Sequence, residues 1–347
     1  MNHNGQLKAA LELVEIAASS GADAVKFQTF CAEALVTKQA ALADYQKKSV
    51  DDASQLEMLK LLELSHDAHF EVKQHCEKLG IDFMSTPFDL DSARFLVEDL
   101  KVERLKVASG ELCNAPLLLA LARTGLPLIV STGMSSLGDI EQALGVIAFG
   151  YLNPGLEPAS SSDFADIHLQ PEANRLLAQN VVLLHCTTEY PAPFADINLN
   201  AMNTMKAAFG LPVGLSDHSV GIAIAHAAVA MGATCIEKHF TVSRSLPGPD
   251  HKASLEPGEL AALVAGIRQI EQGMGSSRKL VTLSETGNRR IATKSLVAAA
   301  PIHRGDKFTA ANLTAKRPGG GIPPIQLWDL IGRSADRDYA PDQMIVI

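Results

Sequence analysis

The chain of 347 residues is 47% apolar and 20% charged, which predicts a folded protein with a sizeable core and argues against disorder. Its net charge of −9 argues against nucleic acid as a partner, so an anionic ligand would need a local basic cluster. No apolar run approaches the roughly 20 residues of a membrane span, and the polar start is unlike a signal peptide. The scattered cysteines, without CxxC spacing, favour a reducing cytosol and no zinc ribbon.

The chain opens on a loop-like motif, Asn2-His3-Asn4-Gly5, and then alternates between helix-like and strand-like segments. Residues 7–20 have helical apolar spacing, and residues 22–28 read as a strand that carries Lys26 and Gln28 near its end. Further helices are expected at 55–64, 67–79, 89–98, 115–123 and 138–147, and further strands at 81–84, 104–107, 126–130 and 181–184. The irregular, Pro- and Ser-containing insert at 153–174 predicts a loop.

The stretch 210–252 organises the rest of the chain. Two short apolar runs, 212–215 and 234–236, flank a helix-like segment at 220–231, which is the pattern of a parallel βαβ unit. His218 and His239 follow the two strands at equivalent positions, each beside a carboxylate. Because neighbouring strands lie about 4.8 Å apart, the two imidazoles are expected to share a divalent metal.

Seven strand-like runs, most followed by helix-like sequence, fit an eight-stranded (β/α) barrel whose first strand is missing, and no GxGxxG supports a dinucleotide fold. Chemistry in such barrels sits at the carboxyl ends of the strands. The residues expected to crowd that mouth are Lys26, Gln28, Thr86, Lys106, Ser109, Glu111, Ser131, Thr188, Tyr190, Ser216, His218, Lys238 and His239. Lysines and short hydroxyls are donors for phosphate or carboxylate, and Lys26 and Lys106 lie in apolar runs where a solvated lysine is unexpected.

Several motifs resemble those of the sialic acid synthases, in the same order and over nearly the whole chain. They are 2–5 (NHNG), 26–28 (KFQ), 85–88 (STPF), 106–111 (KVASGE), 131–134 (STGM), 216–218 (SDH), 237–240 (EKHF) and 247–251 (PGPDH). The resemblance implies condensation of phosphoenolpyruvate with N-acetylmannosamine or a related amino sugar, giving a nine-carbon acid and phosphate. It also implies a divalent metal, typically Mn²⁺, with Mg²⁺ or Co²⁺ as alternatives.

Carried onto this sequence, the resemblance assigns the metal to His218 and His239, and catalytic carboxylates to Glu111 and Asp250. The residues that it assigns to substrate binding are Asn2, Lys26, Gln28, Thr86, Lys106, Ser109, Ser131, Thr188, Tyr190, Ser216 and Arg317. In the family, a carboxylate-bearing strand of the form AEIG precedes the NHNG motif, whereas this sequence starts within the motif. A barrel with a missing or truncated first strand is therefore expected.

The sequence changes character near residue 284, where segments become short and interrupted by Gly and Pro. This predicts a barrel domain at 1–283 and, by resemblance, a small antifreeze-like (SAF) domain at 284–347. In the family, an arginine from this domain reaches the active site of a neighbouring subunit, and Arg317 matches its context. The resemblance thus implies a cytoplasmic, domain-swapped homodimer that binds neither membrane nor nucleic acid.

Two other functions remain open from the sequence. A metal-dependent aldolase or lyase would use the same barrel, because fold alone does not decide chemistry. A non-catalytic sugar- or phosphate-binding protein is the other alternative, since the expected loss of one barrel strand would remove one carboxylate. The choice among N-acetylmannosamine and the precursors of legionaminic and pseudaminic acid also stays open.

Overall fold

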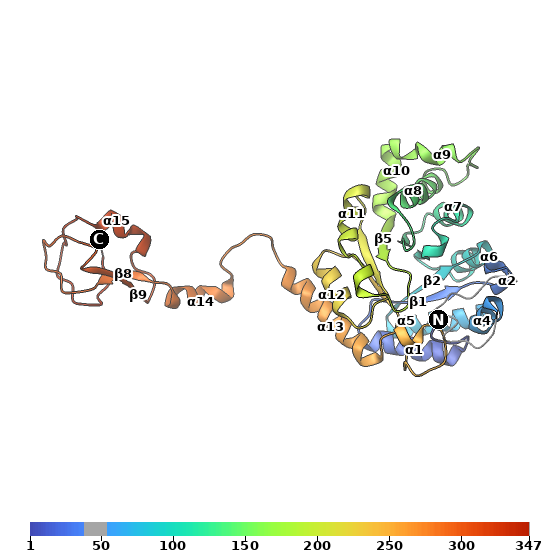
Figure 1. The fold of residues 1–347 in the computed structure, drawn as a ribbon, viewed down its shortest axis with the longest axis horizontal. Helices are drawn as coiled ribbons and strands as arrows, with labels where there is room; N and C mark the ends of the chain where they lie inside the picture. The colour runs from blue at the N-terminus through green and yellow to red at the C-terminus, as the bar shows by residue number, and fades with distance from the viewer. Residues whose placement is uncertain (38–53, 347) are drawn as a thin grey trace. The chain divides into compact units, whose positions relative to one another are not determined.

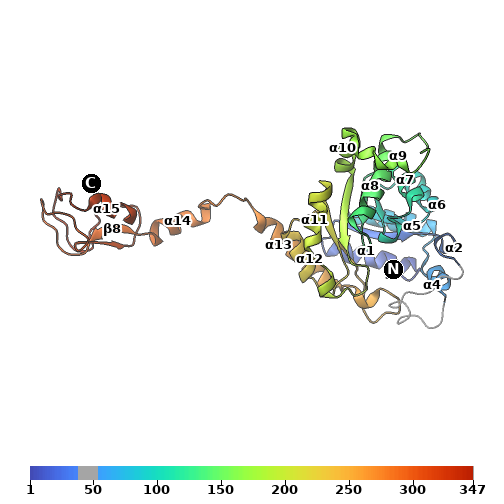
Figure 2. The ribbon, with the colours of Figure 1, turned by 45° about the horizontal axis from the view of Figure 1, so that its top comes forward.

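The computed structural model describes residues 1–37 and 54–346, which form two compact units, Met1–Gly275 and Ser276–Ile347. In the first unit, parallel strands are surrounded by helices (Figures 1 and 2). The strands are β1 (Ala24–Thr29), β2 (Asp82–Pro87), β3 (Leu105–Val107), β4 (Leu128–Ser131), β5 (Val181–Cys186), β6 (Val213–Asp217) and β7 (Ile236–Lys238). The predicted boundary after Leu283 falls at the first residue of helix α14 (Leu283–Ala292).

The strands follow one another around the sheet in chain order. β1 pairs with β2, and β3 through β7 form a second parallel ladder, with β2 lying next to β3. The register brings Gln28 opposite Thr86, and Ser216 opposite Glu237. Consecutive parallel pairing with helical crossovers confirms the predicted α/β barrel class and directs the carboxyl ends of all these strands to one side.

The helices of the first unit begin and end where the sequence supplies caps. In α5, for example, the Ser65 side chain accepts from the Ala68 N–H, and Gly80 ends the helix with φ 69°. The helices are α1 (Leu7–Ser19), α2 (Ala32–Leu35), α4 (Gln55–Leu62), α5 (His66–Leu79), α6 (Leu90–Arg94), α7 (Ala115–Arg123), α8 (Leu137–Leu152), α9 (Ser162–Ala165), α10 (Pro171–Asn180), α11 (Asn200–Phe209), α12 (Ala223–Ala230) and α13 (Pro257–Met274). Their apolar faces bury leucines such as Leu118 and Leu121 against the strands.

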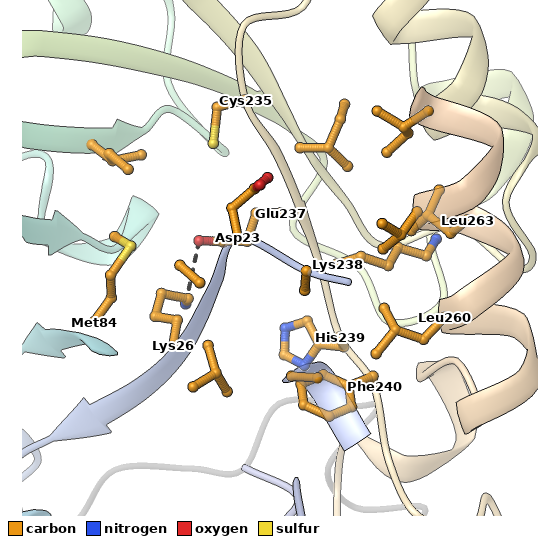
Figure 3. A pocket seen from close by; sticks show the side chains of 18 of the residues that line it. Asp23, Lys26, Met84, Cys235, Glu237, Lys238, His239, Phe240, Leu260 and Leu263 are labelled. Atoms are coloured by element: carbon orange, nitrogen blue, oxygen red, sulfur yellow. Dashed lines mark ion pairs between the residues drawn. The ribbon is translucent and has the colours of Figure 1, made fainter. Parts of the chain in front are cut away.

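The barrel wall is open between β7 and β1. Among the described residues, no ladder joins these two strands. A cavity of about 470 Å³ lies there instead, lined by both strands, by α1 and by α13 (Figure 3). This is the place where an eighth strand would complete an eight-stranded barrel.

The prediction of a loop at 153–174 was only partly right. Helix α9 and a 3₁₀ turn, Ile167–Leu169, lie inside this insert, and α10 begins at Pro171. Ile167 and Ala173 are buried in the main core beneath α8, which explains why the insert is ordered. The Pro at the first position of α10 is a helix-start signal that the loop interpretation overlooked.

The second unit has its own small core. It contains α14, an antiparallel pair of strands, β8 (Ser295–Ala298) and β9 (Leu313–Lys316), and a short helix, α15 (Leu327–Leu330). Leu296, Phe308 and Tyr339 are among its buried residues. In the part of the chain that is described, we find no helix long and apolar enough to cross a membrane.

Candidate active site

Two lysines and two serines converge at the carboxyl ends of β1, β3, β4 and β6. The Nζ of Lys106 is buried, and it donates to the Ser131 Oγ at 2.5 Å and to the Val107 carbonyl at 2.8 Å. The Nζ of Lys26 lies 3.4 Å from the Oε2 of Glu237, and the Ser216 Oγ lies 2.8 Å from the Oε1 of the same carboxylate. The structure thus brings together the predicted anion-binding residues of these four strands.

The two histidines face each other, with ring centroids 5.5 Å apart. His218 Nδ1 lies 2.7 Å from the Thr187 carbonyl oxygen, so this nitrogen carries the proton and Nε2 keeps its lone pair. Burial lowers the pKa of His218, and it lowers the pKa of His239 to about 3 despite the nearby Asp250 carboxylate. Both rings are therefore neutral at physiological pH, which is the form that binds a metal. The Tyr190 ring lies beside both imidazoles, with its centroid 4.3 Å from that of His218 and 5.6 Å from that of His239.

The pair fits a metal site to which the protein supplies two imidazoles. Two carboxylates lie near this pair: Asp250, with 4.0 Å between its Oδ2 and His239 Nδ1, and Glu237, whose Oε1 and His218 Nε2 lie 2.8 and 3.3 Å from the same Ser216 Oγ. Within 1–37 and 54–346, no three His, Cys, Asp or Glu side chains come together as a ready-made ligand set. The remaining ligands of a metal held here would have to be substrate or water.

Two buried hydroxyls at the strand ends have no hydrogen-bond partner among the described residues, Thr86 Oγ1 and Thr188 Oγ1. Leaving a buried polar group unpaired costs about 1–3 kcal/mol, so such groups indicate a site that a ligand or water completes. Thr188 lies close to the backbone of Gly133, where an added Cβ would stand 2.2 Å from its Oγ1 and 2.9 Å from the Ser109 Oγ. Glycine at 133 therefore makes room for these two predicted substrate-binding hydroxyls.

Other predicted residues are more dispersed. Asn2 Nδ2 donates to the Phe240 carbonyl at 2.6 Å and to the Ser254 Oγ at 2.8 Å. Gln28 lines the same cavity as Lys26 and His239. Asp250 contacts the amino group of Met1, as well as lying near His239.

Two predicted residues are not brought to the histidines by any contact described. Glu111 lies in a 3₁₀ turn, where its Oε2 accepts from Asn114 Nδ2 at 2.7 Å. Arg317 belongs to the second unit, where it is exposed.

Sequence reasoning placed Lys238 at the mouth, and this was wrong. Lys238 points to the opposite face of β7, where its Nζ lies 2.7 Å from Asp217 Oδ2, with both side chains almost fully buried. The residue that faces the lysines and Ser216 is Glu237, which we had not predicted. The two-residue period of a strand was the missed signal, because it places Glu237 on the same face as His239.

This strand order and strand-end chemistry define an enzyme of the (β/α)-barrel class. The chain belongs to the NeuB family, whose model matches residues 13–279, and the SAF domain model matches residues 293–346. It is 46% identical over 346 residues to the N,N'-diacetyllegionaminic acid synthase of Campylobacter jejuni, covering 99% of this chain and 96% of the relative. It is 34% identical to the N-acetylneuraminate-9-phosphate synthase of Homo sapiens, covering 96% of this chain and 85% of that protein.

A solved structure leads to the same family. The N-acetylneuraminic acid (sialic acid) synthetase of Leptospira borgpetersenii, crystallised with citrate, matches with a TM-score of 0.64 and 33% identity. The match covers 83% of this chain and 86% of that one.

Proposed function

We propose that the protein condenses phosphoenolpyruvate with an N-acetylated amino sugar and water, giving a nine-carbon sugar acid and inorganic phosphate. The observation that carries this proposal is the cluster of a half-buried Lys26 with the buried Lys106, Ser131 and Ser216 in a NeuB-family barrel. Fixed ammonium groups and short hydroxyls suit a small, highly charged phosphate ester. The relatives are named as synthases of legionaminic and sialic acids, which supports this reaction type.

In this proposal, Lys26 and Lys106 neutralise and orient phosphoenolpyruvate while Thr86 and the serines donate to it. Thr188 and Tyr190 face the sugar, with Asn2, Gln28 and Ser109 nearby. The methylene carbon of phosphoenolpyruvate bonds to the aldehyde carbon of the sugar, water adds at the former enol carbon, and phosphate leaves. Glu111 and Asp250 are the carboxylates that exchange protons with the aldehyde oxygen and the attacking water.

His218 and His239 would hold the metal, for which Mn²⁺ is our first choice over Mg²⁺ or Co²⁺. A bound divalent ion supplies Lewis-acid polarisation of the sugar aldehyde. The hydrogen bond from His218 to the Thr187 carbonyl fixes the tautomer that leaves Nε2 as the ligand atom. The Tyr190 ring contacts both imidazoles and so helps to hold their orientation.

The sugar that we propose is the 2,4-diacetamido precursor of legionaminic acid. The support is the higher identity to the legionaminic acid synthase, 46%, than to the N-acetylneuraminate-9-phosphate synthase, 34%. Because its five cysteines are free, which suits a reducing compartment, we place the enzyme in the cytoplasm, with no nucleic acid or membrane as a partner.

The test is phosphate release by the purified protein, with phosphoenolpyruvate, Mn²⁺ and each of three sugars: N-acetylmannosamine, the legionaminic acid precursor and the pseudaminic acid precursor. We expect phosphate only when phosphoenolpyruvate, metal and sugar are all present, and fastest with the 2,4-diacetamido sugar of the legionaminic series. Cleavage of the nine-carbon product without phosphate release would instead indicate an aldolase or lyase. Binding of these ligands with no turnover would indicate a non-catalytic protein.

We also propose that the active unit is a domain-swapped homodimer in which Arg317 completes the partner's site. The support is the resemblance of its sequence context, the SAF domain match and the exposure of Arg317 in the second unit. An arginine supplied in this way would close the site over anionic and polar substrates and exclude water.

Subunit mixing tests this arrangement. Arg317→Ala and His218→Ala chains are each expected to be poorly active alone, and exchange between them should restore part of the wild-type activity. Mixed dimers would then contain one site with both defects and one with neither. If Arg317 acts on its own chain, every site keeps one defect, and verified exchange would restore nothing.

A further inference from the structure

A carboxylate stands at the centre of the predicted anion site. Glu237, on β7, lies with its Oε2 3.4 Å from Lys26 Nζ and its Oε1 3.8 Å from Lys106 Nζ. Ser216 donates to the same Oε1 at 2.8 Å. Figure 3 shows Lys26 and Glu237 directed toward each other from β1 and β7, across the open side of the barrel. One side chain therefore touches residues from three other strands.

A negative charge in this position opposes the binding of an anionic substrate, because like charges at close range repel strongly in a poorly solvated site. Its presence needs a compensating role. That role is to act as a counter-charge for the ammonium groups beside it. A lysine removed from water loses its charge unless a nearby negative charge stabilises the ammonium form.

Lys106 shows this need most clearly. Its side chain is only 2% exposed, whereas the Glu237 side chain is 18% exposed. Burial lowers the pKa of Lys106 to about 8, and the Glu237 carboxylate opposes that fall. The other groups that act on it are the Lys26 ammonium, which lowers this pKa, and the thiols of Cys186 and Cys235, which raise it.

Contact lengths separate this cluster from an ordinary structural ion pair on the same two strands. Asp217 and Lys238 are 2.7 Å apart on the opposite face, with side chains 1% and 2% exposed. The contacts of Glu237 with its lysines, at 3.4 and 3.8 Å, are longer and shared between two partners. The Glu237 contacts are therefore the ones that an incoming phosphate or carboxylate can replace, while Lys106 Nζ keeps its hydrogen bonds to the Ser131 Oγ and the Val107 carbonyl.

We propose that Glu237 is a positioning residue for the anion site, whose carboxylate keeps the buried Lys106 ammonium group charged and gathers it with the Lys26 ammonium group until an anionic substrate takes over these contacts. The identification of that substrate as phosphoenolpyruvate rests on the proposed function. The role of Glu237 toward the lysines does not.

The first measurement needs no substrate. In protein labelled with ¹³C at lysine Cε, the Lys106 signal, assigned by its loss in Lys106→Met, should titrate near its pKa of about 8. In Glu237→Gln the midpoint should fall by about one unit or more, which is a tenfold change in the proton equilibrium. Glu237→Asp keeps the charge and should restore most of the shift. An unchanged midpoint in Glu237→Gln would overturn the proposal.

The second measurement uses turnover. A lysine with a lowered pKa is protonated below that pKa and loses its charge as the pH rises through it. Glu237→Gln should therefore raise KM for phosphoenolpyruvate by about fivefold or more near pH 8, and less near pH 6, with KM for the sugar nearly unchanged. Asp217→Asn is the matched control, because it breaks an even more deeply buried carboxylate–lysine pair on β6 and β7. It should lower stability without this pH-dependent change in KM.

The outcomes separate the two proposals. If the wild type binds no phosphoenolpyruvate and releases no phosphate, the proposed function fails, yet the Lys106 titration still decides the role of Glu237. If the wild type turns over and Glu237→Gln matches it in KM and pH profile, the role of Glu237 is refuted while the function stands.

Discussion

Replacing His239 with alanine is expected to abolish metal-dependent turnover while the barrel still folds. The protein offers two imidazoles to a metal here, and losing one ligand of so few should weaken metal binding by at least about 10- to 100-fold. The His239 side chain is 25% exposed, so part of the space left by its removal is open to solvent. Turnover and Mn²⁺ binding, measured by titration with both substrates present, should fall together.

His75→Ala is a matched control for this variant. His75 is 24% exposed and faces Glu15 on the helical layer, far in sequence from the strand-end histidines. Its activity should match the wild type. Near-normal activity of His239→Ala at low Mn²⁺ would remove the metal assignment, because no added ion then replaces the lost ligand.

Replacing Lys106 with methionine is expected to raise KM for phosphoenolpyruvate by about tenfold or more, with a smaller effect on KM for the sugar. Methionine fills much of the volume, so the change isolates the lost ammonium group, and a hydrogen bond to a charged group contributes about 1.5–3 kcal/mol. Steady-state kinetics with each substrate varied in turn gives the two constants.

Lys238→Met provides the comparison, since Lys238 is equally buried but pairs with Asp217 on the other face of β7. Thermal unfolding should show a loss of stability in this control, whereas its KM for phosphoenolpyruvate should stay close to that of the wild type. If Lys106→Met changed only the sugar constant, the phosphate would have to be placed elsewhere in the barrel.

Much of the barrel could be predicted because its strands are short apolar runs closed by polar clusters. Residues 181–184, for example, form the core of β5, and Lys106 does lie buried within the apolar run of β3. The site could be placed at the carboxyl ends of the strands because parallel connections bring these ends to one side of the barrel. By this argument Ser131 was expected near Lys106. The same reasoning gave His218 and His239 as neighbours.

The face of the strand to which the last residue of β7 points was not predicted from the sequence. Lys238 was taken for a site residue because lysines bind anions, although the strand alternation assigns that face to Glu237. The helix at Pro171 was missed because the Ser- and Pro-rich residues before it dominated the composition. Arg317 lies in a separate unit, so only experiments such as subunit mixing can relate it to the site.

The open side of the barrel has a consequence for inhibitor discovery. At about 470 Å³, the cavity between β7 and β1 is large enough for a drug-sized molecule, and Val25, Leu260 and Leu263 give it an apolar wall. A screen that measures binding alone would therefore select hydrophobic compounds that bind in this cavity beside α13. Such hits would make no use of the two ammonium groups, whereas useful leads would carry an acidic group for Lys26, which lines the cavity, and for Lys106. A competition assay with a phosphate ester would separate the acidic leads, which it displaces, from the hydrophobic compounds, which it does not.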